Sequence, residues 1–352
     1  YREIKHKILS HPEILNDRVI ILYGKGWHHG VIGIAAARLV EEYAKPCILF
    51  SVEGEESRGS ARSVEGYSMI DAISRCSSLL TRYGGHNQAA GLTVLTKDLP
   101  EFIRQMQEDA REQFDLMPVD ELNIDAVVSA GQLELKTVFG MQLLEPFGCA
   151  NELPVVAMLG CQVEAISPLS ENRHLRLRFS YEGRTMQAVY FRMPTTQFPF
   201  GVGDIVDIAA NLDVNEYNGE KNLSIKIKDV RLHGVHQDKL IVGRQYYEKY
   251  LRGEALEQKI REYIRPQRED IALLYRYLRQ WKQFPFGYDM LWCRLPKLNY
   301  CKMRICIDVM QELGIVEVTQ GEHAAHPVLS VPAKVSKTQL EQSHILRRLS
   351  DD

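Results

Sequence analysis

The first third of the chain alternates between short apolar runs and stretches with apolar residues at helical spacing. The runs 19–23 and 47–50 predict two buried strands. Residues 31–43 between them predict a helix with one apolar face, formed by Ile32, Ala35, Ala36, Leu39 and Val40. A strand, a helix and a strand at this spacing predict a right-handed βαβ unit. Further along, Ser68 predicts the N-cap of a short helix, residues 92–95 a strand and residues 99–116 a last helix. We therefore expect an α/β domain over residues 1–117.

From residue 118 to about 233 the pattern changes to the alternation that is typical of half-exposed strands. Strands are predicted over 174–179, 188–191, 205–209 and 223–228, with glycine-containing turns between them and one short helix over 136–144. Short strands at this density fit a small closed barrel, so we predict an all-β OB-fold over residues 118–233.

The last segment, residues 240–352, has helical periodicity and basic surface positions. Helices are predicted over 271–281 and 300–313, and the second is followed by Gly314 and a strand-like run, 315–318. A helix, a glycine and a β-hairpin are typical of a winged helix, so we predict a mostly helical, winged-helix C-terminal domain. We expect the polar tail after Val331 to fray.

Composition is that of an ordinary globular protein. The 352 residues are 45% hydrophobic and 25% charged, and no apolar run approaches the roughly 20 residues of a membrane span. The seven cysteines are scattered without a Cys-x-x-Cys pair, so we expect reduced thiols in the cytoplasm rather than disulfides or a zinc site. With a net charge of −3, any binding of nucleic acid must come from a local basic patch.

The most informative short motif is the run Gly84-Gly85-His86-Asn87-Gln88-Ala89-Ala90-Gly91. Paired glycines can adopt positive φ and let backbone N–H groups approach an anion, and the histidine can bind a phosphate. We therefore predict a phosphate-binding loop formed by Gly84, Gly85, His86 and Asn87. The alternative is a tight helix-to-strand turn with a surface histidine, which an isolated motif of this length favours.

Two further runs support an anion site. In the run 57–63, Ser60 and Ser63 offer hydroxyls and Arg62 offers a guanidinium fork suited to phosphate. The alternative is an edge strand with solvated arginines. His28 stands at the start of the helix over 31–43, whose N-terminus carries partial positive charge. A capping or packing role for one of the two histidines, His28 or His29, is at least as good an interpretation, and this adjacent pair lacks the spacing for a helical metal site.

Basic and aromatic residues are interleaved on the predicted barrel. The basic candidates for single-strand binding are Arg173, Arg176, Arg178 and Lys221, with Lys226 and Lys228 nearby, and the candidate stacking platforms are Tyr190, Phe191 and Tyr217. Such a surface suits single strands because every base has a π-face and every nucleotide a charge. The alternative is that aromatic residues such as Phe191, Phe198 and Phe200 belong to the core.

Hydrolysis of phosphodiesters usually needs clustered carboxylates that hold two metal ions. The sequence has no D-x-D, D-H-H, H-E-x-x-H, G-x-S-x-G or Walker motif. The chain therefore has residues that can bind a phosphate but no recognisable centre that cleaves one.

Several of these motifs together resemble one family. Residues 26–34, 59–63, 84–86 and 89–91 are similar to the DHHA1 domain, and residues 145–148, 174–175, 214–219 and 227–230 to the OB-fold, of the RecJ family of bacterial single-strand-specific 5′→3′ DNA exonucleases. The resemblance covers about the first two thirds of the chain, and the helical remainder resembles more weakly an extra C-terminal domain of some RecJ proteins. Ala61 departs from the pattern, because the family usually has glycine there.

The resemblance implies a larger enzyme that acts in DNA repair and recombination. Its catalytic DHH domain, with two divalent Mn or Mg ions, would precede Tyr1, residues 1–10 would end a connector helix, and this chain alone would bind no metal and cut no DNA. His86 and the Gly84-Gly85 backbone would then hold the substrate across the cleft from the metals. Ser60 and Arg62 would help to hold its 5′-terminal phosphate or its backbone, and the OB domain would lead in the single strand. A single-strand-binding protein or a RecQ-type helicase is an implied partner, and a membrane is not.

Two other functions stay open. One is a DHH-type phosphoesterase acting on oligoribonucleotides or cyclic dinucleotides, against which the barrel argues because short substrates need no module that guides a strand. The other is a non-catalytic repair scaffold that uses the same folds for protein contacts.

Overall fold

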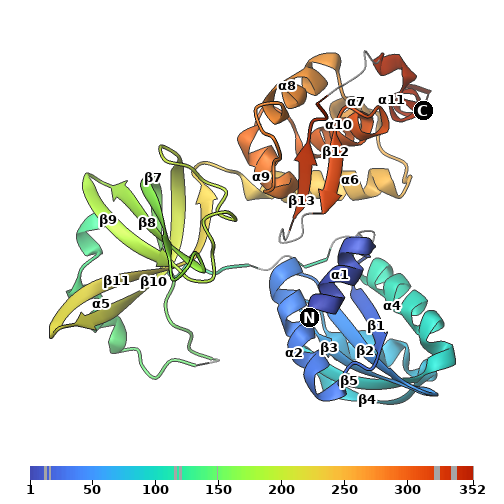
Figure 1. Ribbon diagram of the computed structural model, residues 1–352, viewed down its shortest axis with the longest axis horizontal. Coiled ribbons are helices and arrows are strands. Elements are labelled where there is room, and N and C mark those ends of the chain that lie inside the picture. Colours follow the sequence, from blue (N-terminus) through green and yellow to red (C-terminus); the bar gives the residue numbers. More distant parts are fainter. Residues whose placement is uncertain are drawn as a thin grey trace. The chain divides into compact units, whose positions relative to one another are not determined.

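The computed structural model divides the chain into two compact units, each described by itself below (Figure 1). The structure describes all residues except 12, 13, 16, 115, 116, 119, 120, 149, 321–325, 334–338 and 352. The first unit contains Tyr1–Glu121 and Thr319–Pro327, and the second contains Leu122–Val318 and Val328–Asp352.

The first unit is an α/β domain around a five-stranded sheet of order β1-β2-β3-β5-β4. Its strands are β1 (Ile20–Lys25), β2 (Cys47–Glu53), β3 (Glu56–Arg62), β4 (Leu80–His86) and β5 (Ala89–Leu95). Its α-helices are α1 (Arg2–Ser10), α2 (His29–Tyr43), α3 (Met69–Arg75) and α4 (Leu99–Gln113). The predicted strand–helix–strand unit is confirmed, since β1 and β2 pair in parallel and α2 connects them. The other neighbours in the sheet pair antiparallel.

Each face of this sheet has its own apolar core. On one face, β1 and β2 pack against α1 and α2 through residues such as Ile8, Leu39 and Leu49. On the other face, α3 and α4 cover the sheet, and the rings of Phe50 and Phe102 meet edge to face at 5.7 Å. Helix α2 packs over β2 and β3 on its face of the sheet, whereas the described helices leave β4 and β5, at the far edge, uncovered on that side (Figure 1).

The two small-residue runs form strands, so the prediction of phosphate-binding loops is wrong in its local structure. The run 56–62 is β3, an interior strand that pairs with β2 on one side and β5 on the other, and so is not an edge strand either. The run 84–91 is a β-hairpin formed by the end of β4 and the start of β5. Glycine-rich strands were missed because their side chains carry no hydrophobic alternation, which is the main sequence signal for a strand.

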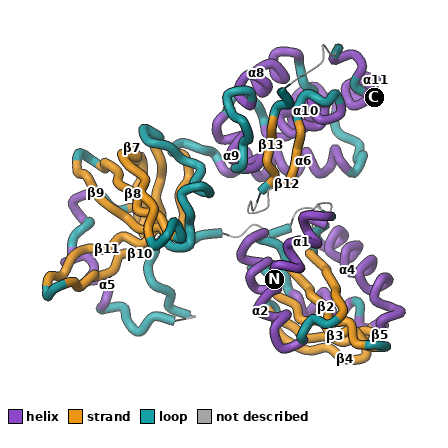
Figure 2. Tube along the Cα trace, in the orientation of Figure 1, coloured by secondary structure: helices purple, strands orange, loops and turns teal. Residues whose placement is uncertain are grey.

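The second unit begins with a barrel. Its strands are β6 (Ala126–Val127), β7 (Val156–Leu169), β8 (His174–Tyr181), β9 (Arg184–Tyr190), β10 (Ile205–Tyr217) and β11 (Glu220–Leu232), with helix α5 (Leu135–Gln142) before β7. They follow the order β10-β11-β9-β8-β7-β6, and an additional pairing of β10 with β7 closes the sheet on itself, as the strands in Figure 2 show. The predicted OB-fold is confirmed, although the long strand β7 was not among the strands predicted from the sequence. Phe198 and Phe200 belong to its core, whereas Phe191 is half exposed.

The remainder of the second unit is mostly helical, as predicted. Its helices are α6 (Gln237–Leu251), α7 (Gln258–Ile264), α8 (Arg268–Leu278), α9 (Gly287–Arg294), α10 (Tyr300–Glu312) and α11 (His344–Asp351). Helix α10 is the central one, with buried residues on several faces, and it is followed by the two-stranded sheet of β12 (Glu317–Gln320) and β13 (Pro327–Ser330). A winged-helix interpretation of this arrangement stays a prediction, as do the domain limits 1–117, 118–233 and 240–352.

Part of the C-terminal tail is ordered, contrary to the expectation that it frays. Ser343 is fully buried, and the backbone N–H of His344 donates to the Glu312 carboxylate at 2.9 Å, which fixes the start of α11 to the end of α10. The six cysteines in the described part of the chain are free, and Cys149 lies outside it. None of the described helices has the length and apolarity to cross a membrane.

Candidate nucleic-acid interface

Three rows of paired residues cross β3, β5 and β4 on one side of the first unit's sheet. The rows are Arg58–Thr93–Arg82, Ser60–Gly91–Gly84 and Arg62–Ala89–His86. Directly paired residues of antiparallel strands point to the same face, so these rows share one face, which we call the open face. Helix α2 borders it, since a Cβ added at Gly33 would lie 2.9 Å from the Ser60 hydroxyl and 3.0 Å from Arg62 Nη2. The register thus brings together Ser60, Arg62, Gly84 and His86, which the sequence had placed in separate runs.

The middle of the open face consists of backbone. Gly84 and Gly91 are paired and exposed, a Cβ added to either would meet no atom within 4 Å, and neither has positive φ. Packing and conformation therefore do not require glycine at these positions, although glycine in a strand costs stability. A glycine with this setting is typical of a site that another molecule's backbone or phosphate approaches closely.

Gly85 has a different role from its neighbour. It lies on the opposite face of β4 with φ of +152°, and a Cβ there would lie 2.3 Å from the Ala89 carbonyl oxygen. Glycine is therefore required for the hairpin itself. Ala61, the departure from the family pattern, is fully buried on this same opposite side, so it leaves the open face unchanged.

Cationic and hydrogen-bonding groups surround the glycines. Arg62 Nη1 donates to the Ala61 carbonyl at 2.8 Å and lies 3.4 Å from the Ser60 hydroxyl, which orients the fork and leaves its other N–H groups available. His86 and Arg82 are exposed and have no ion-pair partner among the residues the structure describes, whereas Arg58 lies 3.7 Å from Glu56. Exposed donors around accessible backbone suit an anion such as a phosphate.

Asn87 lies in the hairpin turn and connects it to helix α3. Its side-chain oxygen accepts from the Ser68 hydroxyl at 3.1 Å, and its carbonyl accepts from the Met69 N–H at 2.9 Å. Ser68 is also the N-cap of α3, as predicted. These contacts make Asn87 a residue that positions the hairpin and with it His86.

His28 is the N-cap of α2, and its Nδ1 accepts from the Gly30 N–H at 3.1 Å. Its ring stacks on His29, which lies 3.6 Å from Glu53 at the end of β2. The His86 row aligns with Cys47 at the other end of β2, six residues or roughly 20 Å away along the strand. The structure therefore does not bring His28 together with His86, and it uses His28 in the capping role.

The barrel presents a second basic surface. Along β8 buried and exposed residues alternate, so Arg176 and Arg178 point outward. Register places Lys226, Val189, Arg176 and Ser167 in one row across β11, β9, β8 and β7. Arg178 is paired with Glu164 at 3.3 Å and Lys226 with Asp213, whereas Arg176 has no partner among the described residues. Strands 2 and 3 of an OB-fold and the loops beside them are where such barrels bind oligonucleotides, and β8 and β9 hold that place here.

The remaining barrel candidates lie in or near the connecting loops. Arg173 is exposed in the β7–β8 connection, with its Nε donating to the Ser170 carbonyl at 3.1 Å. Lys221, at the start of β11, lies 6.0 Å from the ring centre of Phe139. Tyr217 ends β10, and its side chain lies outside the part that the structure describes. Among the candidate stacking residues, Tyr190 has a structural role, because its hydroxyl donates to the Lys228 carbonyl at 3.2 Å.

Sequence reasoning missed two residues of the open face. Arg58 and Arg82 lie opposite each other across Thr93, and neither was a candidate. The two-residue alternation Arg82–Gly84–His86 was a signal that could have found Arg82, because residues two apart on a strand share a face.

Comparisons with known proteins agree with this geometry. The DHHA1 domain family matches residues 16–112, and the RecJ OB domain family matches residues 124–229. The single-stranded-DNA-specific exonuclease RecJ of Bacillus subtilis strain 168 is 28% identical over 221 residues, which are 61% of this chain and 28% of that protein. RecJ of Escherichia coli K12 is 27% identical over 220 residues, 60% of this chain and 38% of that protein.

Solved structures give the same result. RecJ from Thermus thermophilus in complex with Mn²⁺ matches with a TM-score of 0.53 and 27% identity, over 69% of this chain and 37% of that one. The same protein in complex with Mg²⁺ matches with a TM-score of 0.51 and 26% identity, over 69% of this chain and 40% of that one. In the described part of this chain, no group of three or more His, Cys, Asp or Glu side chains is arranged to hold a metal ion. These residues therefore do not fit such an ion, and we assign no step to one.

The chain spans 28% to 38% of the length of the two curated relatives named above. Within that span, the DHHA1 and OB matches are consecutive, and each coincides with one of the folds described. The chain therefore carries a DHHA1 domain followed by a RecJ OB domain, and over these two domains it is similar to RecJ exonucleases.

Proposed function

We propose that this chain is the substrate-binding portion of a RecJ-type exonuclease that degrades single-stranded DNA in the 5′→3′ direction during DNA repair and recombination. The observation that supports this most is the open face, where the sheet register gathers Ser60, Arg62, Gly84 and His86 around accessible backbone. The matched relatives are single-stranded-DNA-specific exonucleases, and they share both folds.

On the open face, the terminal phosphate of the strand would be held by hydrogen bonds from charged groups. The Arg62 fork has unused donors, and His86 is exposed beside it in the same row. The glycines between them let the strand's backbone approach the sheet more closely than any side chain would allow. Ser60 then supplies a hydroxyl beside Arg62.

On the barrel, Arg176 and Arg178 point outward from β8, and Arg173 and Lys221 lie beside it in the loops. These residues would track the phosphates of the incoming strand, which makes binding dependent on salt. Because the described residues assemble no metal centre, we expect the chain alone to bind single strands without degrading them. The two divalent Mn or Mg ions would then be held by a DHH domain, and a single-strand-binding protein or a RecQ-type helicase stays a predicted partner.

The test is binding of fluorescent oligo(dT) to the 352-residue chain, measured by anisotropy with 5′-phosphorylated, 5′-hydroxyl and duplex probes. His86→Ala and Arg62→Ala should each weaken binding of the phosphorylated probe about 10- to 100-fold, because hydrogen bonds to charged groups are the strong ones. His236→Ala is the matched control, since His236 is also exposed but lies outside both surfaces.

A second readout separates the two surfaces. Arg176→Gln should lower the slope of log affinity against log salt by about one, without changing the preference for a 5′-phosphate. Equal affinity for single strands and duplex, or unchanged binding in both open-face variants, would contradict the proposal. Tight binding of cyclic dinucleotides in place of oligo(dT) would favour the phosphoesterase alternative.

A further inference from the structure

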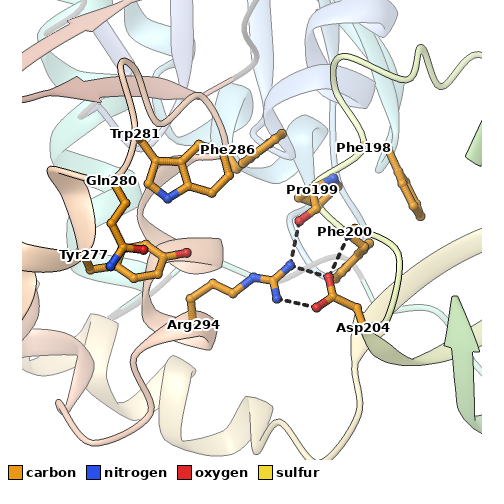
Figure 3. Close-up of a pocket in the computed structure, with 10 residues that line it drawn as sticks. Phe198, Pro199, Phe200, Asp204, Tyr277, Gln280, Trp281, Phe286 and Arg294 are labelled. Carbon is orange, nitrogen blue, oxygen red and sulfur yellow. Dashed lines mark hydrogen bonds and ion pairs between the residues drawn. The ribbon is translucent and has the colours of Figure 1, made fainter.

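A pocket lies within the second unit, between the barrel and the helical part. Its volume is about 590 Å³, which falls within the range of small-molecule pockets. The barrel contributes Phe198, Pro199, Phe200, Gly201 and Asp204 from the β9–β10 connection, and α8, α9 and the segment between them contribute Tyr277, Gln280, Trp281, Phe286 and Arg294. Figure 3 shows the two groups facing each other, with Arg294 reaching from one to the other.

An ion pair fixes the two walls of this pocket. Both terminal nitrogens of Arg294 donate to the Asp204 carboxylate, at 2.8 and 2.6 Å, and Nη2 also donates to the Pro199 carbonyl at 3.0 Å (Figure 3). These bonds draw the pKa of Asp204 below its usual value, so the pair is fully charged and neutral overall at pH 7. A pocket without net charge in its floor can accept an uncharged planar group.

The aromatic side of the pocket is held rigidly but not buried completely. Trp281 meets Phe284 at 5.3 Å and Phe286 at 5.9 Å, both edge to face, and Phe284 is anchored by backbone hydrogen bonds to Leu329 of β13. Even so, 38% of Trp281 is exposed. A large ring that is supported on its edges and open to solvent at the mouth of a pocket is a platform for another planar group. Gln280 beside it offers an amide that can both donate and accept hydrogen bonds.

The segment on either side of Trp281 in the sequence is cationic. Residues 276–282 contain Arg276, Arg279 and Lys282 and no acidic residue. Arg279 and Lys282 flank Trp281, are exposed and have no ion-pair partner among the described residues. A neutral aromatic pocket with cations beside it suits a base attached to a phosphate backbone, because the rings can stack on the base while the cations contact phosphates.

The pocket is also continuous with the binding surface proposed for the barrel. The β9–β10 connection that forms its wall begins at Phe191, which packs against His174 at 5.3 Å. The N–H of Arg192 donates to His174 Nδ1 at 2.8 Å, and Thr195 donates to Asn172 at 2.9 and 3.0 Å, which holds this connection against the β7–β8 loop that carries Arg173. A strand that follows β8 therefore meets this connection and the pocket at its end.

The geometry points to a base-binding pocket: one unstacked base of the single strand inserts between the barrel and α8 and stacks on Trp281, while Arg279 and Lys282 contact the adjacent phosphates. This inference rests on the proposed function, because it extends the same single-strand path. It gives the helical domain a role in holding DNA and makes that contact tolerant of sequence, since every base has a π-face.

The test compares oligo(dT) with an abasic oligomer of the same length and charge, using the full chain. Trp281→Ala should weaken binding of oligo(dT) about 5- to 150-fold, the range measured for loss of one base–aromatic stack, and leave the abasic oligomer within about two-fold. Trp281→Phe, which keeps a stacking ring, should retain most of the affinity. An equal loss for both oligomers, or no loss for either, would overturn the inference.

A fluorescence measurement keeps the test independent of whether Trp281→Ala folds. The chain has three tryptophans, and Trp292 is buried with its Nε1 bonded to the Leu298 carbonyl. Saturation with oligo(dT), but not with the abasic oligomer, should quench emission in the wild-type chain and not in Trp281→Phe. If this difference in quenching is absent, the inference is overturned. The proposed function would still stand if oligo(dT) binds the wild-type chain and His86→Ala weakens that binding. Failure of oligo(dT) to bind the wild-type chain would overturn both.

Discussion

In the rows of the open face, arginine and histidine side chains surround exposed glycine backbone, and no Phe, Tyr or Trp is present. In the pocket of the second unit, by contrast, aromatic side chains form the walls, and the charge of Arg294 is neutralised by Asp204. Free cations next to accessible backbone recognise the phosphate of a strand. Rings around a neutral floor recognise its bases. The open face would thus bind the phosphate of a single strand in a fixed geometry, and the pocket would bind a base without regard to sequence.

The largest effect should come from breaking the hairpin that carries His86. Gly85→Ala places a Cβ 2.3 Å from the Ala89 carbonyl oxygen at φ of +152°. We expect a loss of about 2–4 kcal/mol in the unfolding free energy of the first unit, from backbone strain and overlap together. Calorimetry should show a transition lowered by about 10 °C or more, at 4–8 °C per kcal/mol for a domain of this size.

The same variant tests whether the two regions act separately. If they do, Gly85→Ala should lose the preference for a 5′-phosphate while quenching of Trp281 by oligo(dT) persists. An unchanged melting transition would show that the hairpin tolerates a side chain at this position, against the interpretation of Gly85 as a structural glycine.

A smaller effect is expected at Gly91, the matched control with open space around its Cβ position. Gly91→Ala should leave stability unchanged or raise it by up to about 1 kcal/mol, because alanine is less costly than glycine in a strand. If the strand's backbone approaches the sheet there, affinity for 5′-phosphorylated oligo(dT) should nevertheless fall about 3- to 10-fold, as steric exclusion of a contact worth about 1 kcal/mol would give. Anisotropy gives the affinity of Gly91→Ala, and thermal melting of the same sample gives its stability. An unchanged affinity would show that the bound strand does not approach the sheet at these glycines.

The smallest effect concerns the ion pair below the pocket. Hydrogen bonds from Arg294 lower the pKa of Asp204 below its usual 3.8, so the stability they contribute is present above about pH 4 and is lost as the pH falls below it. Because the pair is partly exposed, we expect no more than about 1 kcal/mol. The melting temperature of the second unit should therefore fall less between pH 7 and pH 3 in Asp204→Asn than in the wild-type chain. A parallel fall in both would show that the pair does not join the barrel to the helical part.

The sequence predicted the elements with strong periodicity and missed those without it. The helices over 31–43 and 300–313 and the alternating strand at 174–179 lie where apolar spacing placed them. The runs 58–63 and 84–91 were interpreted as phosphate-binding loops, with an edge strand as the alternative for the first. Glycine, serine and arginine are common in turns, and the strand conformation of these runs is imposed by neighbouring strands. At the start of α2 the sequence left open whether His28 or His29 caps the helix or packs, and only the structure assigns the cap to His28.

The amino-acid sequence alone establishes which chemical groups this protein has and which family it resembles. The glycines, the arginine and the histidine of the two motifs can be read directly from it. Which of these groups act together follows only from the folded chain. Register between β3, β5 and β4 puts Ser60, Arg62, Gly84 and His86 on one face, turns Gly85 away and leaves His28 at the far end of the sheet. The pocket around Trp281 likewise exists only where two segments about eighty residues apart meet through Arg294 and Asp204. The physical reason is that glycine-rich strands carry little of the hydrophobic alternation that specifies register, so their pairing depends on segments that are distant in the sequence.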